Sequence, residues 1–125
     1  METRLTHKSN LTIGENDTAL AIGSGDMPVW GTPSMLALME NAAMLCVQNE
    51  LEEGQTTVGG HIESSHLRSS PIGANVYAVA ELTSVEGRKL HFHVAAYQQT
   101  ADGDTLLGEG RHLRIIADRD KFLKR

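Results

Sequence analysis

The sequence predicts an α+β fold in which one long central helix is wrapped by a curved antiparallel sheet. The first observation is a single helical segment that is apolar on nearly every side, which is typical of a helix buried all round. The second is that every later segment reads as strand and turn, with strands of about twelve residues, roughly twice the usual length. Long strands that cover one buried helix have to curl around it.

The chain before the helix predicts one strand, a turn and a shorter second strand. Alternation of apolar and polar residues from Thr3 to Ile13 indicates the first strand, and the cluster that begins at Gly14 indicates a turn. The short apolar piece from Thr18 to Ile22 is interpreted as the returning edge of a hairpin. These pieces supply the first edge of the sheet.

The central helix has the clearest start signal in the chain. Thr32 is a good N-cap residue, and Pro33 suits the first helical position, where its missing N–H costs nothing. The helix is predicted to run to about Leu51 or Glu53 and to stop at Gly54. It forms the core of the domain.

Four strands are predicted after the helix, and turn signals separate them. One central helix inside a long curved antiparallel sheet is the hotdog fold, and the 125 residues fit one such domain over residues 1–125. The predicted strands are Thr56 to Arg68, Ala74 to Val85, Lys89 to Gln99 and Thr105 to Ile116.

Composition and charge exclude several classes of protein. The formal charge of -5 and the lack of a clustered basic surface argue against nucleic acid as the main partner. No segment approaches the roughly 20 apolar residues of a membrane span. The single cysteine, Cys46, excludes an intrachain disulfide framework and a Cys-rich metal site. We therefore expect a cytoplasmic protein without a metal or cofactor, in which Cys46 is a buried, inert thiol.

Glu40 interrupts the apolar helix, where a carboxylate is costly unless it is paired or hydrogen-bonded. One interpretation is that its side of the helix reaches solvent or pairs with an arginine. The other is a carboxylate held at an active site, where partial burial makes it a better base or nucleophile. The neighbouring Met35, Leu36 and Met39 are then expected to line a small or medium apolar pocket.

The predicted strand from Thr56 to Arg68 carries a second candidate group, His66. Period-two alternation places His66 on the same face as Gly60 and Ile62. If that face meets the helix, the imidazole points toward the region of Glu40. A hydrogen-bonded core histidine is the alternative.

The same strand predicts two further site features. The pair Gly59-Gly60 weakens a strand, which indicates either close approach of a backbone or ligand, or a bulge. Arg68 is the first candidate to bind the phosphates of a coenzyme, with a solvated surface residue as the alternative. The histidines expected on the outer face of the sheet are His61, His91 and His93.

Four stretches of the chain carry a family resemblance, namely Thr32 to Glu40, Gly59 to His66, Ser84 to Leu90 and Gly108 to Phe122. In their order and spacing they resemble the fluoroacetyl-CoA thioesterase-like branch of the hotdog superfamily, and the likeness spans nearly the whole chain. The segment from Gly23 to Trp30 looks shorter than the lid region of that family, and its phenylalanine gate has no counterpart. The resemblance therefore implies thioesterase chemistry and not selectivity for fluoroacetate.

The resemblance implies roles for four residues. The family's catalytic threonine, glutamate and histidine match Thr32, Glu40 and His66, and its glycine near the thioester carbonyl matches Gly59. In the implied mechanism Glu40 attacks the carbonyl or activates a water, and a backbone N–H near Gly59 stabilises the oxyanion. His66 would orient or protonate a reacting group, and Thr32 would hydrogen-bond the carboxylate or the carbonyl.

Helix geometry constrains how these residues meet. Thr32 and Glu40 are eight residues apart, which is roughly 12 Å along one helix and too far for a shared hydrogen bond. Either Thr32 bends back before the helix begins, or one site draws residues from two subunits. Hotdog relatives usually dimerise with the active site at the interface, so we expect a homodimer or a dimer of dimers.

The sequence thus predicts an acyl-CoA thioesterase that hydrolyses a short or medium acyl-CoA thioester. A non-catalytic acyl-CoA binding or sensing module with the same fold is the alternative. A hotdog dehydratase or isomerase is less favoured, because its usual acid and base pattern is absent. The predicted catalytic residues are Thr32, Glu40 and His66, and the predicted substrate-binding residues are Gly59, Gly60 and Arg68.

Overall fold

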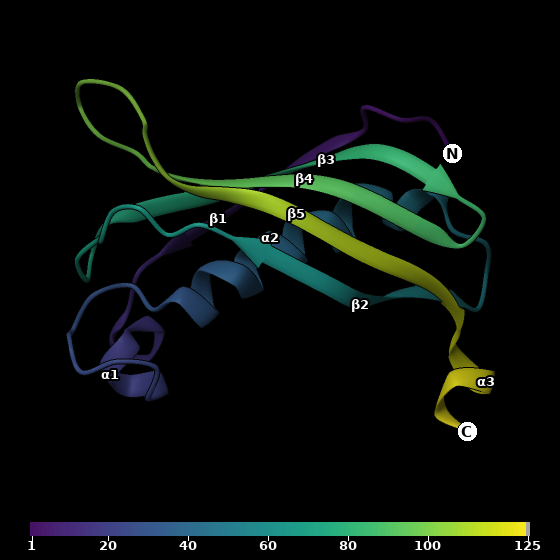
Figure 1. The fold of residues 1–125 in the computed structure, drawn as a ribbon, viewed down its shortest axis with the longest axis horizontal. Helices are drawn as coiled ribbons and strands as arrows, with labels where there is room; N and C mark the ends of the chain where they lie inside the picture. The colour runs from purple at the N-terminus through teal and green to yellow at the C-terminus, as the bar shows by residue number, and fades with distance from the viewer. Residues whose placement is uncertain (125) are drawn as a thin grey trace.

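A single curved sheet forms most of the molecule (Figure 1). The computed structural model describes residues 1–124. The five strands lie in the order β1-β3-β4-β5-β2, and every neighbouring pair is antiparallel. The predicted fold class is confirmed, because this sheet curls over one long helix. The strands are β1 (Thr6–Thr12), β2 (Gln55–Ser64), β3 (Asn75–Glu86), β4 (Lys89–Gln98) and β5 (Thr105–Asp118).

The helices have very unequal lengths. Only α2 is long, and it lies under the concave side of the sheet (Figure 1). None of the helices in residues 1–124 is long and apolar enough to cross a membrane. The helices are α1 (Ala19–Ile22), α2 (Thr32–Val47) and α3 (Arg119–Leu123), with 3-10 turns η1 (Glu15–Asp17) and η2 (Gln48–Glu50).

Residues Ala19–Ile22 are helical, so the prediction of a strand from Thr18 to Ile22 is wrong. The Thr18 side chain caps α1 by accepting a hydrogen bond from the Ala21 N–H at 3.1 Å. Gly23, at φ 90°, ends the helix in the left-handed conformation. These two end signals stabilise a single turn that the apolar pattern alone did not distinguish from a short strand.

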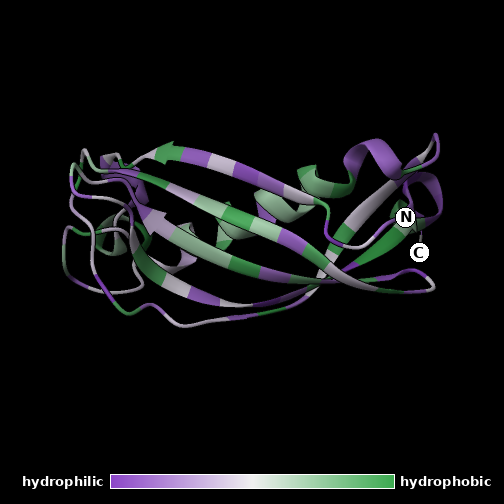
Figure 2. Ribbon diagram, turned by 90° about the horizontal axis from the view of Figure 1, so that it is seen from above, coloured by the Kyte–Doolittle hydropathy of each residue, from purple (hydrophilic) through white to green (hydrophobic). Residues whose placement is uncertain are grey.

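One face of α2 fills the core, and the other is open. The buried face packs mainly on β3 and β1. On the opposite side Ala37 is exposed and Met44 is 37% exposed, so the prediction of a helix buried all round is wrong for a single chain. Figure 2 shows α2 lying along the sheet. The buried residues of α2 are Met35, Met39, Ala42, Ala43 and Val47.

The edge strand β2 contains a bulge. Gly59 pairs with Arg114 of β5, whereas His61 pairs with Leu113, so Gly60 is an extra residue without a partner on β5. The bulge that the sequence left open as an explanation of the two glycines is therefore present.

The bulge reverses which residues of β2 face the helix. Before it, Thr57 and Gly59 point inward; after it, Ile62 packs against the core. The predicted shared face of Gly60 and Ile62 is wrong, because a Cβ on Gly60 would point at the outer side chain of Ile115, 3.1 Å away. Simple alternation fails here because one unpaired residue shifts the period by one.

Two glycines allow β5 to lie unusually close to the chain of β2. A Cβ on Gly108 would overlap the carbonyl oxygen of Ser65, and a Cβ on Gly110 would overlap that of Glu63. The obstacle in both cases is backbone, which cannot rotate away. These glycines set how tightly the edge strand is held.

We predict that Gly110→Ala destabilises the fold by about 1–3 kcal/mol, the usual cost of overpacking. Chemical denaturation followed by circular dichroism measures this. Gly14→Ala is the control, because a Cβ there would meet its nearest atom, Asp17 Oδ2, at an ordinary 3.5 Å. Equal stability of the two variants would contradict the role assigned to Gly110.

Candidate active site

Thr32 and His66 form a hydrogen-bonded pair at the start of α2. Gly31 is the N-cap and makes no side-chain cap, so the prediction that Thr32 is the N-cap is wrong. Thr32 is instead the first helical residue, and its hydroxyl lies 2.7 Å from Nδ1 of His66. This distance is within the reach expected for a nucleophile or proton donor and its base.

The segment between α1 and α2 holds this pair in place. The Trp30 N–H donates to the Ser70 carbonyl at 2.8 Å, and the Gly31 N–H donates to the Asp17 carbonyl at 2.9 Å. The Trp30 ring is buried and lies edge-on to His66, with ring centres 6.4 Å apart. The sequence marked Trp30 only as the end of a segment; its role depends on these tertiary contacts.

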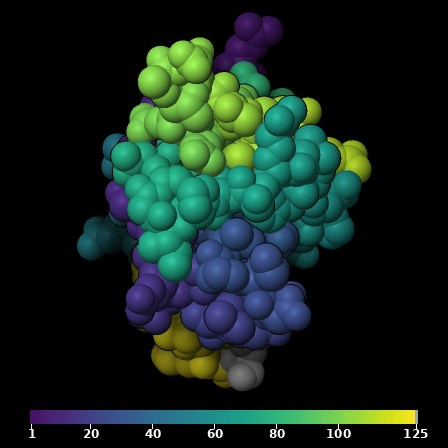
Figure 3. Space-filling model, turned by 90° about the vertical axis from the view of Figure 1, so that its left-hand side faces the viewer, coloured from purple at the N-terminus to yellow at the C-terminus, as the bar shows by residue number. Residues whose placement is uncertain are grey.

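A hollow of about 280 Å³ opens beside the Thr32–His66 pair. Trp30 and Arg68 also line it. His66 and Arg68 follow the end of β2 at Ser64, so the prediction of a strand that reaches Arg68 is wrong. Figure 3 views the end of the molecule where the segment before α2, in blue, lies against the segment that follows β2, in teal. Arg68 is exposed there, as a residue that contacts the outer part of a ligand would be.

The His66 imidazole is partly buried, and burial lowers its pKa, opposed by a hydrogen bond with the backbone of Arg68. Its Nε2 is buried and has no hydrogen-bond partner among residues 1–124. A buried ring nitrogen without a partner is rare in a structural histidine. It therefore favours a role in chemistry over a core residue with both nitrogens satisfied.

Glu40 lines a second hollow, of about 260 Å³, between α2 and β2. A Cβ on Gly59 would lie 2.9 Å from Glu40 Oε2, 3.6 Å from His112 Cε1 and 3.9 Å from Arg114 Nη1. A Cβ at this position would displace the end of the Glu40 side chain, so glycine leaves space for the carboxylate where it lies. Of the two explanations offered for the glycine pair, a bulge accounts for Gly60 and a close approach accounts for Gly59.

His112 lines this hollow and Arg114 is buried beside it, and neither is among the predicted site residues. They are 2% and 7% exposed. Both sit on the inward face of β5 at period-two spacing, and that alternation is the signal that could have found them. A basic residue at an inward strand position needs either a counter-charge or a ligand.

Hydrogen bonds hold the Arg114 guanidinium on three sides. Nε donates to Thr57 Oγ1 at 2.8 Å, Nη2 donates to the Thr57 carbonyl at 2.9 Å, and Nη1 lies 3.2 Å from His112 Nε2. Burial lowers the pKa of Arg114, while the negative charge of Glu40 raises it. Glu40 thus faces an arginine and also lines a hollow, so features of both interpretations of Glu40 are present.

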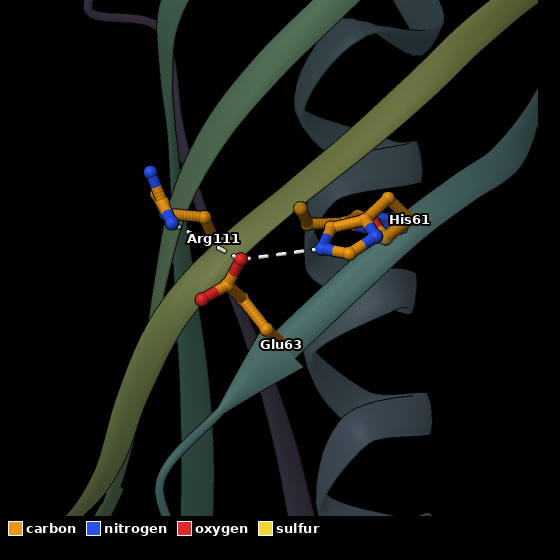
Figure 4. Close-up of polar contacts among 4 residues, drawn as sticks. His61, Glu63 and Arg111 are labelled. Carbon is orange, nitrogen blue, oxygen red and sulfur yellow. Dashed lines mark hydrogen bonds and ion pairs between the residues drawn. The ribbon is translucent and has the colours of Figure 1, made fainter.

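The outer face of the sheet carries the other histidines, as the sequence predicted. His61 Nε2 lies 3.2 Å from Glu63 Oε1, and Arg111 donates to the same oxygen at 3.1 Å (Figure 4). The pKa of Glu63 is lowered, first by the hydrogen bond with His61 and then by Arg111. His91 and His93 lie beside Glu86 and Glu109 respectively.

Within one chain the predicted site residues form two groups. Thr32, His66 and Arg68 share the first hollow, and Glu40, Gly59 and Gly60 share the second. The structure does not bring His66 next to Glu40 within one subunit. Thr32 lies within α2, so it does not bend back toward Glu40.

The expected apolar pocket differs from what the structure shows. Met35 and Met39 are fully buried in the core rather than lining either hollow, and Leu36 is half-buried. Cys46 is also half-buried, and burial raises the pKa of its thiol. In residues 1–124 no three His, Cys, Asp or Glu side chains are grouped so as to hold a metal ion.

The chain is similar to several known proteins. The chain is 37% identical to the fluoroacetyl-CoA thioesterase of Streptantibioticus cattleyicolor over 94 residues, which is 75% of this chain and 65% of that protein. A solved variant of the fluoroacetyl-CoA-specific thioesterase FlK, in complex with fluoroacetate and CoA, superposes with a TM-score of 0.89 at 27% identity over 98% of this chain and 99% of that chain.

A Thermus thermophilus hypothetical protein of the thioesterase superfamily superposes with a TM-score of 0.88 at 28% identity, over 98% of this chain and 88% of that chain. Two of these relatives are fluoroacetyl-CoA thioesterases, and the third is a member of the thioesterase superfamily. The family match itself spans residues 13–120 and includes all the predicted site residues. The chain belongs to the fluoroacetyl-CoA-specific thioesterase family.

Proposed function

We propose that the protein hydrolyses a short or medium acyl-CoA thioester at a site shared by two subunits. Thr32 and His66 come from one subunit, and Glu40 and Gly59 from its partner. The observation that carries the proposal is the 2.7 Å pair of Thr32 and His66, placed in a different hollow from Glu40. Neither hollow alone holds all the groups that the family resemblance implies.

The edge strand β2 supports a shared site. One side of β2 pairs with β5, and the other has no neighbouring strand. If two β2 strands pair antiparallel about a two-fold axis near residues 62 and 63, His66 lies opposite Gly59 of the partner subunit. The same pairing covers the open side of α2, where Ala37 and Met44 are exposed.

We infer a chemical role for each group from this arrangement. The Thr32 hydroxyl lies 2.7 Å from Nδ1 of His66, so in the tautomer that leaves Nδ1 unprotonated His66 can take a proton from that hydroxyl or from a water. The Glu40 carboxylate attacks the thioester carbonyl or deprotonates a water that does so. A backbone N–H near Gly59 stabilises the oxyanion of the tetrahedral intermediate. The products are a carboxylate and free coenzyme A thiol. No cofactor is needed for this hydrolysis.

A binding or sensing module with the same fold is the competing function. It would bind acyl-CoA without releasing thiol, and it would not require a Thr32–His66 pair at hydrogen-bond distance. Release of free thiol from a panel of acyl-CoA thioesters of increasing chain length distinguishes the two. A reducing, cytoplasmic compartment suits either function, since the one cysteine is unpaired.

We predict that Glu40→Gln lowers the rate of thiol release at least 100-fold, because it keeps the volume but removes the charge. His66→Ala should lower it by about 10²–10⁴. Far-ultraviolet circular dichroism checks that both variants fold. His93→Ala, on the outer face, is the control and should keep full activity. Near wild-type turnover of a folded Glu40→Gln protein would exclude the assigned role.

A mixing experiment tests whether the site is shared. When Glu40→Gln and His66→Ala subunits are co-expressed in equal amounts, about half of the dimers carry one of each. Each such dimer has one intact site if the site is shared, so about one quarter of the wild-type activity should return. A site contained within one subunit predicts no recovery. Light scattering establishes that the mixture is dimeric or a dimer of dimers.

Arg68 is proposed to bind the phosphates of coenzyme A, since it is exposed at the mouth of the hollow that His66 lines. Arg68→Ala should raise KM for a CoA thioester about tenfold, the effect of one charge-assisted hydrogen bond. The N-acetylcysteamine thioester of the same acid lacks the nucleotide and should be unaffected. Arg111→Ala, an outer-face arginine, is the matched control. Equal losses on both substrates would show that Arg68 does not bind the nucleotide end.

A further inference from the structure

His112 connects two strands through both of its ring nitrogens. Its Nδ1 lies 2.7 Å from the His61 carbonyl oxygen on β2, and its Nε2 lies 3.2 Å from Arg114 Nη1 on β5. The ring is 2% exposed and lies beside Phe92 of β4. His61, whose carbonyl His112 contacts, directly follows the bulge in β2.

These contacts specify the protonation state of His112. A carbonyl oxygen can only accept, so Nδ1 must carry a proton and donate it. A guanidinium can only donate, so Nε2 must present its lone pair to Arg114. Both requirements are met only by the neutral imidazole protonated on Nδ1. A second proton on Nε2 would place two donors and two positive charges face to face.

The bond from His112 also determines where Arg114 points. Three of the five guanidinium N–H groups are used, two by Thr57 and one by His112. Nη1 is the nitrogen that lies 3.9 Å from the Cβ position of Gly59, a residue that lines the Glu40 hollow. His112 is the residue that holds this nitrogen, whereas both Thr57 bonds hold the other side of the group.

We propose that His112 is a positioning residue for thioester hydrolysis: as the neutral Nδ1–H tautomer, it holds Arg114 Nη1 against the hollow formed by Glu40 and Gly59. The proposal rests on the proposed function, since it takes this hollow to be half of the reaction site. It makes the site sensitive to acid through the protonation of His112.

The charged groups around His112 act in opposing directions. Burial lowers its pKa most, and the positive charges of Arg114 on β5 and His61 on β2 lower it further. The bond to the His61 carbonyl and the negative charge of Glu40 on α2 raise it. Because the net pKa is lowered, the neutral form prevails near pH 7, and protonation follows only as the pH falls below the ordinary histidine value of about 6.5.

Two substitutions distinguish the contact made by Nε2 of His112 from the contact made by Nδ1. His112→Gln places an amide oxygen near Nε2, where it can accept from Arg114, whereas His112→Asn places its amide near Nδ1 and leaves Arg114 without an acceptor. We expect kcat/KM to fall at least tenfold in the His112→Asn protein and only a few-fold in the His112→Gln protein. The acid limb of the pH profile should also become shallower in Gln. The proposal would be overturned if both folded variants lost the same fraction of kcat/KM, or if the acid limb of the pH profile were unchanged in the His112→Gln protein.

A nuclear magnetic resonance experiment tests the tautomer without any turnover. In protein with nitrogen-15 histidine at pH 7, we expect the long-range proton–nitrogen spectrum to show His112 protonated on Nδ1. Arg114→Leu should raise the pKa of His112 in the same spectrum. Protonation on Nε2 would overturn the proposal. Absence of thioester hydrolysis by the wild-type protein, with the Nδ1–H tautomer observed, would instead overturn the proposed function.

Discussion

The candidate site depends on one local feature, the bulge at Gly60 in the edge strand β2. The extra residue lets Thr57 and Gly59 face inward before it and Ile62 face inward after it. Thr57 then holds Arg114, and Gly59 leaves space for the Glu40 carboxylate. Without the bulge, regular alternation would turn either the site residues or the core residues of this strand toward solvent.

Burial of polar groups gives the second hollow its chemical character. Arg114 is inside the sheet, where an unpaired charge would be very costly, and three hydrogen bonds together with the charge of Glu40 offset that cost. Such a network is rigid because each member satisfies another. It presents fixed N–H groups beside a carboxylate, an arrangement that suits stabilisation of developing negative charge.

Several features were predictable from the sequence because they follow from local pattern. The strands β3, β4 and β5 were predicted to within two residues at each end, since clear turn signals bound each of them. The sequence also indicated Thr32 and His66 as candidate site residues, but it paired Thr32 with the carboxylate or the carbonyl, whereas the structure pairs Thr32 with His66. The network of His112 and Arg114 was missed, because its meaning depends on partners from β2 that are far away in the chain.

The sequence by itself determined the fold class, because the order of one apolar helix and long alternating strands leaves few ways to bury the helix. It also indicated the family and the residue types of the site. Only the tertiary structure decided where the faces of β2 reverse, that Gly31 rather than Thr32 caps α2, and that Glu40 and His66 lie in separate hollows. Each of these outcomes depends on how strands and helix pack across space, and a local pattern does not encode that packing.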